Sequence, residues 1–171
     1  AIGFSQKSKI PFELGIIRSH YVGRTFIEPS QTIRQFGVKL KHSVNRSCIE
    51  NKKVILIDDS IVRGTTANKI VKMVYEAGAK EVHLGISCPP ILHPDFYGID
   101  TPNYNQLLAS KSNLKEMTEL VGAKSLFFLS LNGTYKAMGC EKRNSKTPQF
   151  TDHCFTGEYP IDVTEILKLN R

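Results

Sequence analysis

The clearest pattern of apolar positions lies in the middle of the chain, between residues 53 and 87. Lys53–Asp58, KVILID, is a continuous apolar run rich in β-branched residues, which is typical of a strand covered on both faces. Apolar residues then recur at i, i+3, i+4 and i+7, and so predict one face of an amphipathic helix: Ala67, Ile70, Val71 and Val74. Gly78 is a suitable helix stop, and Val82–Ser87 reads as a second strand. Strand, helix and strand within about 35 residues form a βαβ unit and predict a parallel sheet.

Weaker patterns on either side of this unit predict further elements. Two are strands, two are helices or helix-like, and one polar stretch is expected to be a loop. In chain order they are the strand Phe12–Arg18, the helix with apolar positions Leu114, Met117, Leu120 and Val121 that ends at Gly122, the strand Ser125–Leu131, the loop Cys140–Gln149 and the helix Val163–Leu169. The sequence therefore predicts the α/β class with a parallel sheet.

A long basic segment interrupts the regular pattern. Residues 19–51 contain Gly23, Pro29 and Gly37 and show no clean helical or strand period, and a loop of this length in a compact domain usually has a function. Residues 18–53 hold eight Lys or Arg and two Glu, which accounts for six of the seven net positive charges. Such a segment indicates an anionic partner. A solvated surface or a nonspecific nucleic-acid patch remains the alternative.

The cysteines and histidines give no sign of a disulfide framework or of a metal site. The four cysteines contain no C-x-x-C pair, and we read them as reduced thiols in a cytoplasmic protein. The five histidines show no ligand spacing and are expected not to bind a metal. No apolar run approaches the roughly 20 residues needed to span a bilayer. The four cysteines are Cys48, Cys88, Cys140 and Cys154, and the five histidines are His20, His42, His83, His93 and His153.

Two adjacent acids end the first strand of the βαβ unit. Asp58 and Asp59 are costly to bury unless something binds them, and ligands of parallel sheets sit at the carboxyl ends of the strands. The following turn, SIVRGTT, leads into a helix whose N-terminus offers free N–H groups and a positive dipole end. Gly64 allows close approach of a ligand, and the two threonines add hydroxyl donors, so the turn predicts a phosphate cradle.

This layout fits a ligand with a phosphate at one end and a diol at the other, such as a ribose 5-phosphate. The carboxylates can accept hydrogen bonds from vicinal hydroxyls or hold a divalent cation. A Walker A loop is excluded because no Lys precedes Thr65, and a Walker B strand requires that loop. A receiver domain lacks Gly-Thr-Thr after its acids. The simplest alternative is that Asp58 is only a helix cap or a turn residue.

Val54–Thr66, VILIDDSIVRGTT, resembles the signature for phosphoribosyl pyrophosphate (PRPP) of type I phosphoribosyltransferases. Its second part, DDSIVRGTT, is similar in particular to the glutamine amidophosphoribosyltransferase family. Pro11–Arg34, Phe96–Pro102 and Cys154–Pro160 resemble further segments of that family, so the resemblance covers nearly the whole chain.

The resemblance implies a parallel-sheet, Rossmann-like phosphoribosyltransferase core. Family members are much longer and begin with a glutaminase domain. The chain is therefore expected to be one truncated domain, 1–171, without that domain and without the first part of the core. Within it we expect a flexible basic loop region, 19–51, and a C-terminal tail, 140–171.

The implied reaction is the first step of de novo purine biosynthesis. Nitrogen, as glutamine-derived ammonia, is transferred to C1 of PRPP, and 5-phosphoribosylamine and pyrophosphate are the products. The expected partners are PRPP, ammonia channelled from a glutaminase domain outside this chain, and purine nucleotides as inhibitors, but neither nucleic acid nor a membrane. A homo-oligomer is left open. This chain is expected to be at most ammonia-dependent.

The resemblance also implies roles for particular residues. Asp58 and Asp59 would contact the ribose hydroxyls and hold Mg²⁺, and the turn would bind the 5-phosphate. A loop that starts near Tyr21 would close over PRPP with basic residues facing the pyrophosphate. The implied PRPP-binding residues are Asp58, Asp59, Ser60, Ile61, Val62, Arg63, Gly64, Thr65 and Thr66, and the implied catalytic residues are Tyr21, Arg24, Lys39 and Lys41.

Departures from the family pattern matter as well. Some members hold a 4Fe–4S cluster with four cysteines, but two of those positions are Asp95 and Thr151 here, and only Cys154 matches. We therefore expect no iron–sulfur cluster and read Cys154 as a packed thiol. Two alternatives to the amidophosphoribosyltransferase remain: a non-catalytic regulatory module that binds PRPP or a nucleotide, and a salvage phosphoribosyltransferase.

Overall fold

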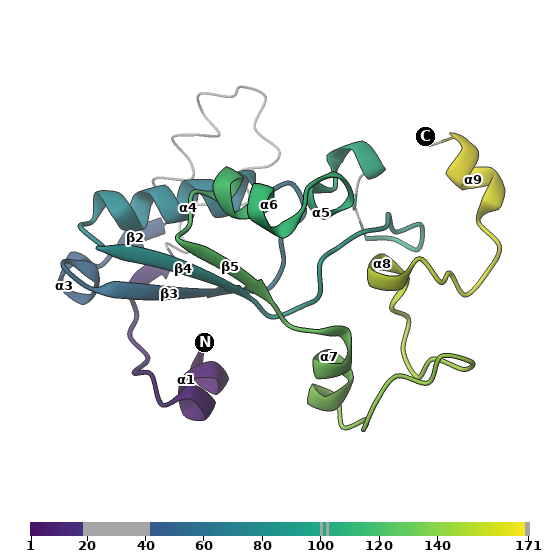
Figure 1. Cartoon of the computed structure of the whole chain (residues 1–171), viewed down its shortest axis with the longest axis horizontal. Coiled ribbons are helices and arrows are strands. Elements are labelled where there is room, and N and C mark those ends of the chain that lie inside the picture. The colour runs from purple at the N-terminus through teal and green to yellow at the C-terminus, as the bar shows by residue number, and fades with distance from the viewer. Residues whose placement is uncertain (19–41, 100, 102, 170–171) are drawn as a thin grey trace. The chain divides into compact units, whose positions relative to one another are not determined.

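The computed structural model of the chain describes residues 1–18, 42–99, 101 and 103–169 (Figure 1). The chain divides into two compact units: Ala1–Val54 with Lys72–Glu81, and Ile55–Val71 with Val82–Arg171. Among the described residues, no helix combines the length and the apolar character that a membrane span requires.

The predicted parallel sheet is present. Strands β3 (Lys53–Asp58), β4 (Glu81–Ile86) and β5 (Ser125–Phe128) are ordered β3-β4-β5 and run in one direction (Figure 1). β4 and β5 pair in parallel with His83 opposite Ser125. The expectation that β3 is fully covered is wrong, because its residues from Val54 onward are only half-buried, and it stands at one end of the described strand order. The middle strand β4 is the buried one.

Two helices complete the βαβ arrangement as predicted. Helix α4 (Thr65–Glu76) links β3 to β4, and its predicted face is buried at Ala67, Val71 and Val74. Helix α6 (Leu114–Val121) precedes β5 and ends at Gly122, whose φ of 73° is a left-handed angle that glycine adopts readily. Asn68 Nδ2 of α4 donates to the carbonyl oxygen of Leu120 in α6 at 2.8 Å, which ties the two helices together.

The first unit holds most of the N-terminal elements. The elements that lie wholly within its described residues are α1 (Ile2–Ser8), β1 (Ile16–Arg18), β2 (His42–Val44) and α3 (Arg46–Ile49). β1 and β2 pair antiparallel with Ile16 opposite Val44. Ile49 is only 2% exposed. A Cβ on Gly15 would lie 3.3 Å from its Cδ1 atom, so the Ile49 side chain packs against the backbone next to this hairpin.

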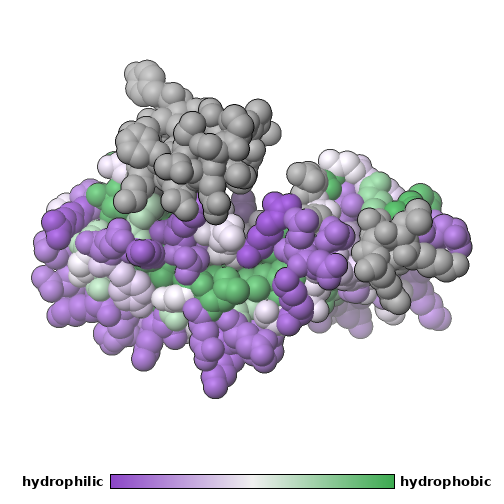
Figure 2. Space-filling model, turned by 90° about the horizontal axis from the view of Figure 1, so that it is seen from above, coloured by the Kyte–Doolittle hydropathy of each residue, from purple (hydrophilic) through white to green (hydrophobic). Residues whose placement is uncertain are grey.

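The second unit contains the remaining elements after β4. They are the 3₁₀ helix η2 (Tyr104–Gln106), α5 (Leu108–Lys111), α7 (Leu131–Ala137), α8 (His153–Thr156) and α9 (Thr164–Leu169). Its buried apolar side chains come from the sheet, α4, α5, α6 and α7, and include Leu84, Leu108, Met117, Leu126 and Tyr135. Figure 2 shows that apolar patches also reach the surface between hydrophilic ones, and α6 exposes Leu114 and Leu120.

Several sequence predictions need correction. The strand predicted over Ser125–Leu131 ends at Phe128, because Ser130 caps α7 by accepting the N–H of Gly133 at 3.0 Å. Within the expected loop region 19–51, residues 42–51 contain β2 and α3, and residues 19–41 lie outside the described residues. The tail 140–171 holds α8 and α9, whereas Cys140–Gln149 has no regular element, as predicted.

Candidate functional site

The acid pair lies at the carboxyl edge of the sheet. Asp58 is the last residue of β3, and its carbonyl oxygen accepts bonds from the N–H and the hydroxyl of Ser87, at 2.9 and 3.0 Å. Because Ser87 directly follows β4, these bonds fix the ends of the two neighbouring strands together. Asp58 is half-buried and Asp59 is exposed, so at least one carboxylate faces solvent.

Local hydrogen bonds orient the two carboxylates. The N–H of Asp59 donates to Asp58 Oδ1 at 3.0 Å, and Ser60 Oγ donates to Asp59 Oδ1 at 3.0 Å. Each interaction uses one carboxylate oxygen of its acceptor. An ionised carboxylate has about four lone-pair sites, so each retains capacity for a hydroxyl or a cation.

The turn after the acids is held from the side by the segment that contains η2 and α5. Ile61 is 4% exposed and anchors the turn in the core. The carbonyl oxygen of Val62 accepts the N–H of Leu108 at 2.8 Å, and Arg63 Nε donates to Gln106 Oε1 at 2.9 Å. The turn is thus a fixed loop, although Arg63 itself is exposed.

Gly64 is required by both its backbone angle and its surroundings. Its φ is 78°, which L side chains rarely adopt. A Cβ at this position would lie 2.8 Å from Leu108 Cδ2 and 3.0 Å from Leu120 Cδ2. The glycine therefore allows the turn to pass close to α5 and α6 and to enter α4.

Helix α4 then presents its N-terminus to solvent. Thr65 and Thr66 are exposed in its first turn, which contains no acidic residue. The first N–H groups of a helix have no partners within the helix, and the dipole adds a partial positive charge there. The end of β3 and the start of α4 thus place carboxylates and anion-binding groups at one edge of the sheet.

Cys88 is a neighbour of the acid pair that sequence reasoning missed. It lies two residues after the end of β4, at the same edge of the sheet where Asp59 follows β3, and its place just after a predicted strand was the available signal. Burial raises the pKa of the Cys88 thiol to about 11, and the negative charges of Asp59 and Asp58 add to the rise. The thiol is therefore protonated at neutral pH and does not act as a nucleophile there.

The structure brings together only part of the predicted site. Asp58 to Thr66 form one continuous edge, as described above. Tyr21, Arg24, Lys39 and Lys41 lie outside the described residues, and so does His20. The four cysteines are unpaired.

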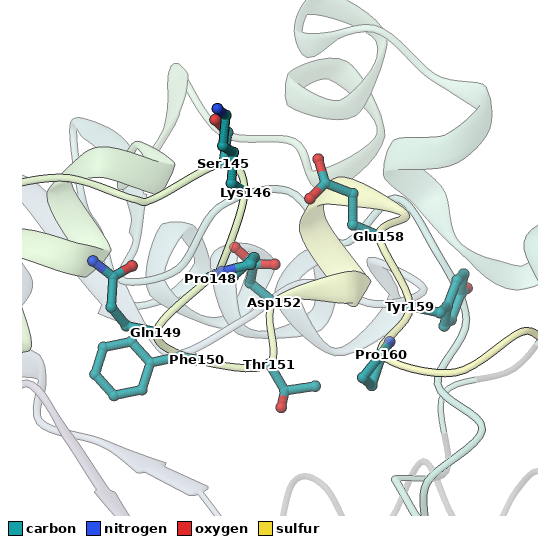
Figure 3. A pocket seen from close by; sticks show the side chains of 10 residues that line it. All are labelled: Ser145, Lys146, Pro148, Gln149, Phe150, Thr151, Asp152, Glu158, Tyr159 and Pro160. Carbon is teal, nitrogen blue, oxygen red and sulfur yellow. The ribbon is translucent and has the colours of Figure 1, made fainter.

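A cavity of about 490 Å³ lies elsewhere, between the segment after α7 and the residues that flank α8 (Figure 3). Two carboxylates line it, Asp152 and Glu158, and both are ion-paired with Arg143 at 2.5 Å. Their charges are thus compensated within the protein. The remaining lining residues are Ser145, Lys146, Pro148, Gln149, Phe150, Thr151, Tyr159 and Pro160.

Comparison with known proteins gives strong similarities to one kind of enzyme. No protein-family model matches the chain. The amidophosphoribosyltransferase of Rhizobium etli is 63% identical over 166 residues, which are 96% of this chain and 34% of that protein. The amidophosphoribosyltransferase of Bacillus subtilis is 50% identical over 163 residues, with 95% and 34% covered. The chain thus spans about a third of the length of the curated relatives it matches.

Two solved structures agree with the sequence relatives. One is the glutamine PRPP amidotransferase of Bacillus subtilis in complex with ADP and GMP, with a TM-score of 0.82 and 49% identity over 96% of this chain and 36% of that one. The other is described as the allosteric regulatory enzyme of purine biosynthesis, with a TM-score of 0.82 and 48% identity over 99% of this chain and 36% of that one.

Proposed function

We infer that the chain is the phosphoribosyltransferase part of an amidophosphoribosyltransferase, because it is a close relative of these enzymes over nearly its whole length and about a third of theirs. The activity that we propose is the transfer of ammonia to C1 of PRPP, which gives 5-phosphoribosylamine and pyrophosphate. One observation carries this proposal: the strand β3 delivers two acids to a sheet edge where a glycine turn opens the N-terminus of α4.

The proposed binding mode assigns a task to each side of this edge. Asp58 and Asp59 accept hydrogen bonds from the ribose hydroxyls, and the N–H groups and hydroxyls of residues 60–66 bind the 5-phosphate. The bonds from Gln106 and Leu108 to Arg63 and Val62 keep this turn in shape before the ligand arrives. A preformed turn reduces the entropy that binding would otherwise cost.

The acid pair also suits Mg²⁺, which prefers carboxylate oxygens together with water and substrate phosphates. Asp58 and Asp59 are the residues that would hold it. When bound, the ion would neutralise negative charge that develops on the leaving pyrophosphate. We further propose that Tyr21, Arg24, Lys39 and Lys41 face the pyrophosphate, on the basis of the sequence alone.

Isothermal titration of PRPP with Mg²⁺ into the chain tests the binding site. We expect binding by the wild type and its loss in Asp58→Asn/Asp59→Asn, because amides of the same shape keep the fold but lose the charges. Glu76→Gln/Glu141→Gln is the matched control, since it removes two negative charges from exposed positions elsewhere. Equal affinity in both double variants would contradict the proposed site.

A turnover assay then separates the proposed enzyme from its alternatives. Formation of pyrophosphate from PRPP and ammonia supports the amidophosphoribosyltransferase, and turnover with a free purine or pyrimidine base instead supports a salvage transferase. PRPP binding without turnover supports a regulatory module. The structure with ADP and GMP favours a test of purine nucleotides as inhibitors, and competition with PRPP in the same titration provides it.

A further inference from the structure

A second group of ligating side chains lies away from the acid pair, where residues 92–99 contact α8. His153 and Asp95 are 4% and 8% exposed, and Cys154 is half-buried. His153 Nε2 is 2.7 Å from Asp95 Oδ1 and 3.4 Å from Cys154 Sγ. A carboxylate oxygen, an imidazole nitrogen and a thiol sulfur all lie within 4.8 Å of one another.

Further hydrogen bonds hold Asp95 and Cys154 in place. They do not use Asp95 Oδ1 or Cys154 Sγ, the atoms that lie close to His153 Nε2. Asp95 Oδ2 accepts the N–H groups of Tyr97 and Ile99, at 2.9 and 2.7 Å, which leaves Oδ1 for His153. The carbonyl oxygen of Cys154 accepts the N–H groups of Leu92 and His93 at 2.9 and 3.0 Å. The converging atoms are therefore positioned by the backbone of both segments.

Rings on the imidazole faces limit its motion. Tyr97 packs edge-on against His153 with ring centroids 5.0 Å apart, and the ring of Tyr159 lies 5.1 Å away at a tilt of 32°. The hydroxyl of Tyr159 is in turn fixed by the carbonyl oxygen of Pro94 at 2.8 Å. A fixed ring keeps Nε2 aimed at the other two atoms.

Nε2 of His153 lies close to both other side chains of the cluster. It carries at most one hydrogen, and it is within reach of the Asp95 carboxylate and of the Cys154 sulfur, whose thiol is only a weak hydrogen-bonding group. A cation can bond to all three atoms at once. We propose that Asp95, His153 and Cys154 bind a divalent transition metal ion, for which Zn²⁺ has the matching preference for thiolate, imidazole and carboxylate together.

The surroundings also predict the kind of site. Buried His153 Nδ1 has no hydrogen-bond partner among the described residues, whereas metal-bound histidines nearly always donate from the other nitrogen. With three protein ligands, the fourth position is open. We therefore expect a reversible site that a chelator empties while the fold persists, in contrast to a four-cysteine site. This departs from the sequence expectation that His153 binds no metal and that Cys154 is a packed thiol.

Co²⁺ is the probe for this proposal, because thiolate coordination to Co²⁺ gives a charge-transfer band that oxygen ligands do not. We expect one Co²⁺ per reduced chain, a thiolate-to-cobalt band, and its loss when Zn²⁺ is added. Cys154→Ser should abolish the band, Asp95→Asn and His153→Gln should weaken binding at least tenfold, and Cys140→Ser is the matched control that keeps it. Because Cys88 lies beside Asp58 and Asp59, loss of the band in Cys154→Ser is what assigns it to this cluster and keeps the test independent of the PRPP site.

A measurement on the wild type alone removes any dependence on how the variants fold. Zn²⁺ should protect Cys154 from alkylation and leave Cys140 reactive, as read from the labelled peptides by mass spectrometry. Absence of the cobalt band and of Zn²⁺ protection in a folded wild-type chain overturns the proposal. So does a band that persists in Cys154→Ser.

Discussion

The turn of the candidate site depends on one residue, Gly64, for two separate reasons. Its left-handed backbone disfavours any side chain by about 1–2 kcal/mol. The added Cβ would also meet Leu108 at 2.8 Å, and Leu108, 3% exposed, is packed in the core and has little room to give way. Such overpacking typically costs about 1–3 kcal/mol.

We therefore expect Gly64→Ala to lower the free energy of unfolding by about 2–4 kcal/mol, measured by urea denaturation. Gly139→Ala is the matched control, because Gly139 has a φ of 85° but no atom within 4 Å of its Cβ position. Gly139→Ala should lower the free energy of unfolding only by the cost of the left-handed backbone angle. Gly64→Ala should in addition bind PRPP more weakly. Equal losses of stability in the two variants would argue against the steric contribution.

Helix α6 illustrates how an element next to the site is secured at its ends. The side chain of Asn113 accepts the N–H groups of Lys115 and Glu116, at 2.9 and 3.0 Å. Glu116 Oε2 accepts the N–H of Asn113 at 2.9 Å, which completes a capping box. Because Leu120 of α6 lies against Gly64 of the turn, the helix supports the site from behind.

Removal of this cap should cost measurable stability. We expect Asn113→Ala to lower the free energy of unfolding by about 0.5–2 kcal/mol, since two N–H groups lose their acceptor. Asn132→Ala in α7 is the control, because Asn132 is exposed and alanine favours a helix. The measurement is chemical denaturation of both variants, and a loss in Asn132→Ala as large as in Asn113→Ala would count against the cap.

The elements that sequence patterns predicted are those whose signals are local. β3, α4 and α6 match because a strand run, a helical period and a terminal glycine all lie within a few residues of each other. The predicted strand extends past Phe128 because Leu129 and Leu131 continue the apolar run, and this run hides the local N-cap signal of Ser130, whose side chain accepts the N–H of Gly133 three residues later. The two sites differ in the same way. The residues from Asp58 to Thr66 are adjacent in the chain, so sequence patterns could predict their site. Asp95 and His153 are 58 residues apart, so only the fold brings them together.

A larger polar network joins the C-terminal part of the second unit. Arg143 donates to both oxygens of Asp152, at 2.5 and 3.2 Å, and to Glu158 at 2.5 Å. The hydroxyl of Tyr135, a buried residue of α7, donates to Asp152 at 2.8 Å. The network therefore connects α7, the segment after it and α8, over a region that has few regular elements to hold it.

Asp152 makes the stability of this region depend on pH. Burial alone would raise the pKa of its carboxyl group, but the bonds from Arg143 and Tyr135 outweigh burial and lower that pKa. A carboxyl whose pKa is lower in the folded than in the unfolded chain stabilises the fold above its unfolded pKa of about 3.9. That contribution is lost as the pH falls from about 4 through the folded value.

We accordingly expect Asp152→Asn to be less stable than the wild type at pH 7 by about 3 kcal/mol, because it leaves Arg143, whose side chain is only 10% exposed, without its main partner. The difference should shrink at pH 3, below the unfolded pKa of about 3.9, because the unfolded wild-type chain then binds a proton that folded Asp152 resists. Urea denaturation of both proteins at the two pH values measures it. Glu158→Gln is the control, since that side chain is 55% exposed and should contribute less than about 1 kcal/mol. If the difference between wild type and Asp152→Asn were the same at both pH values, the charge of Asp152 would not be what holds α7 and α8 together.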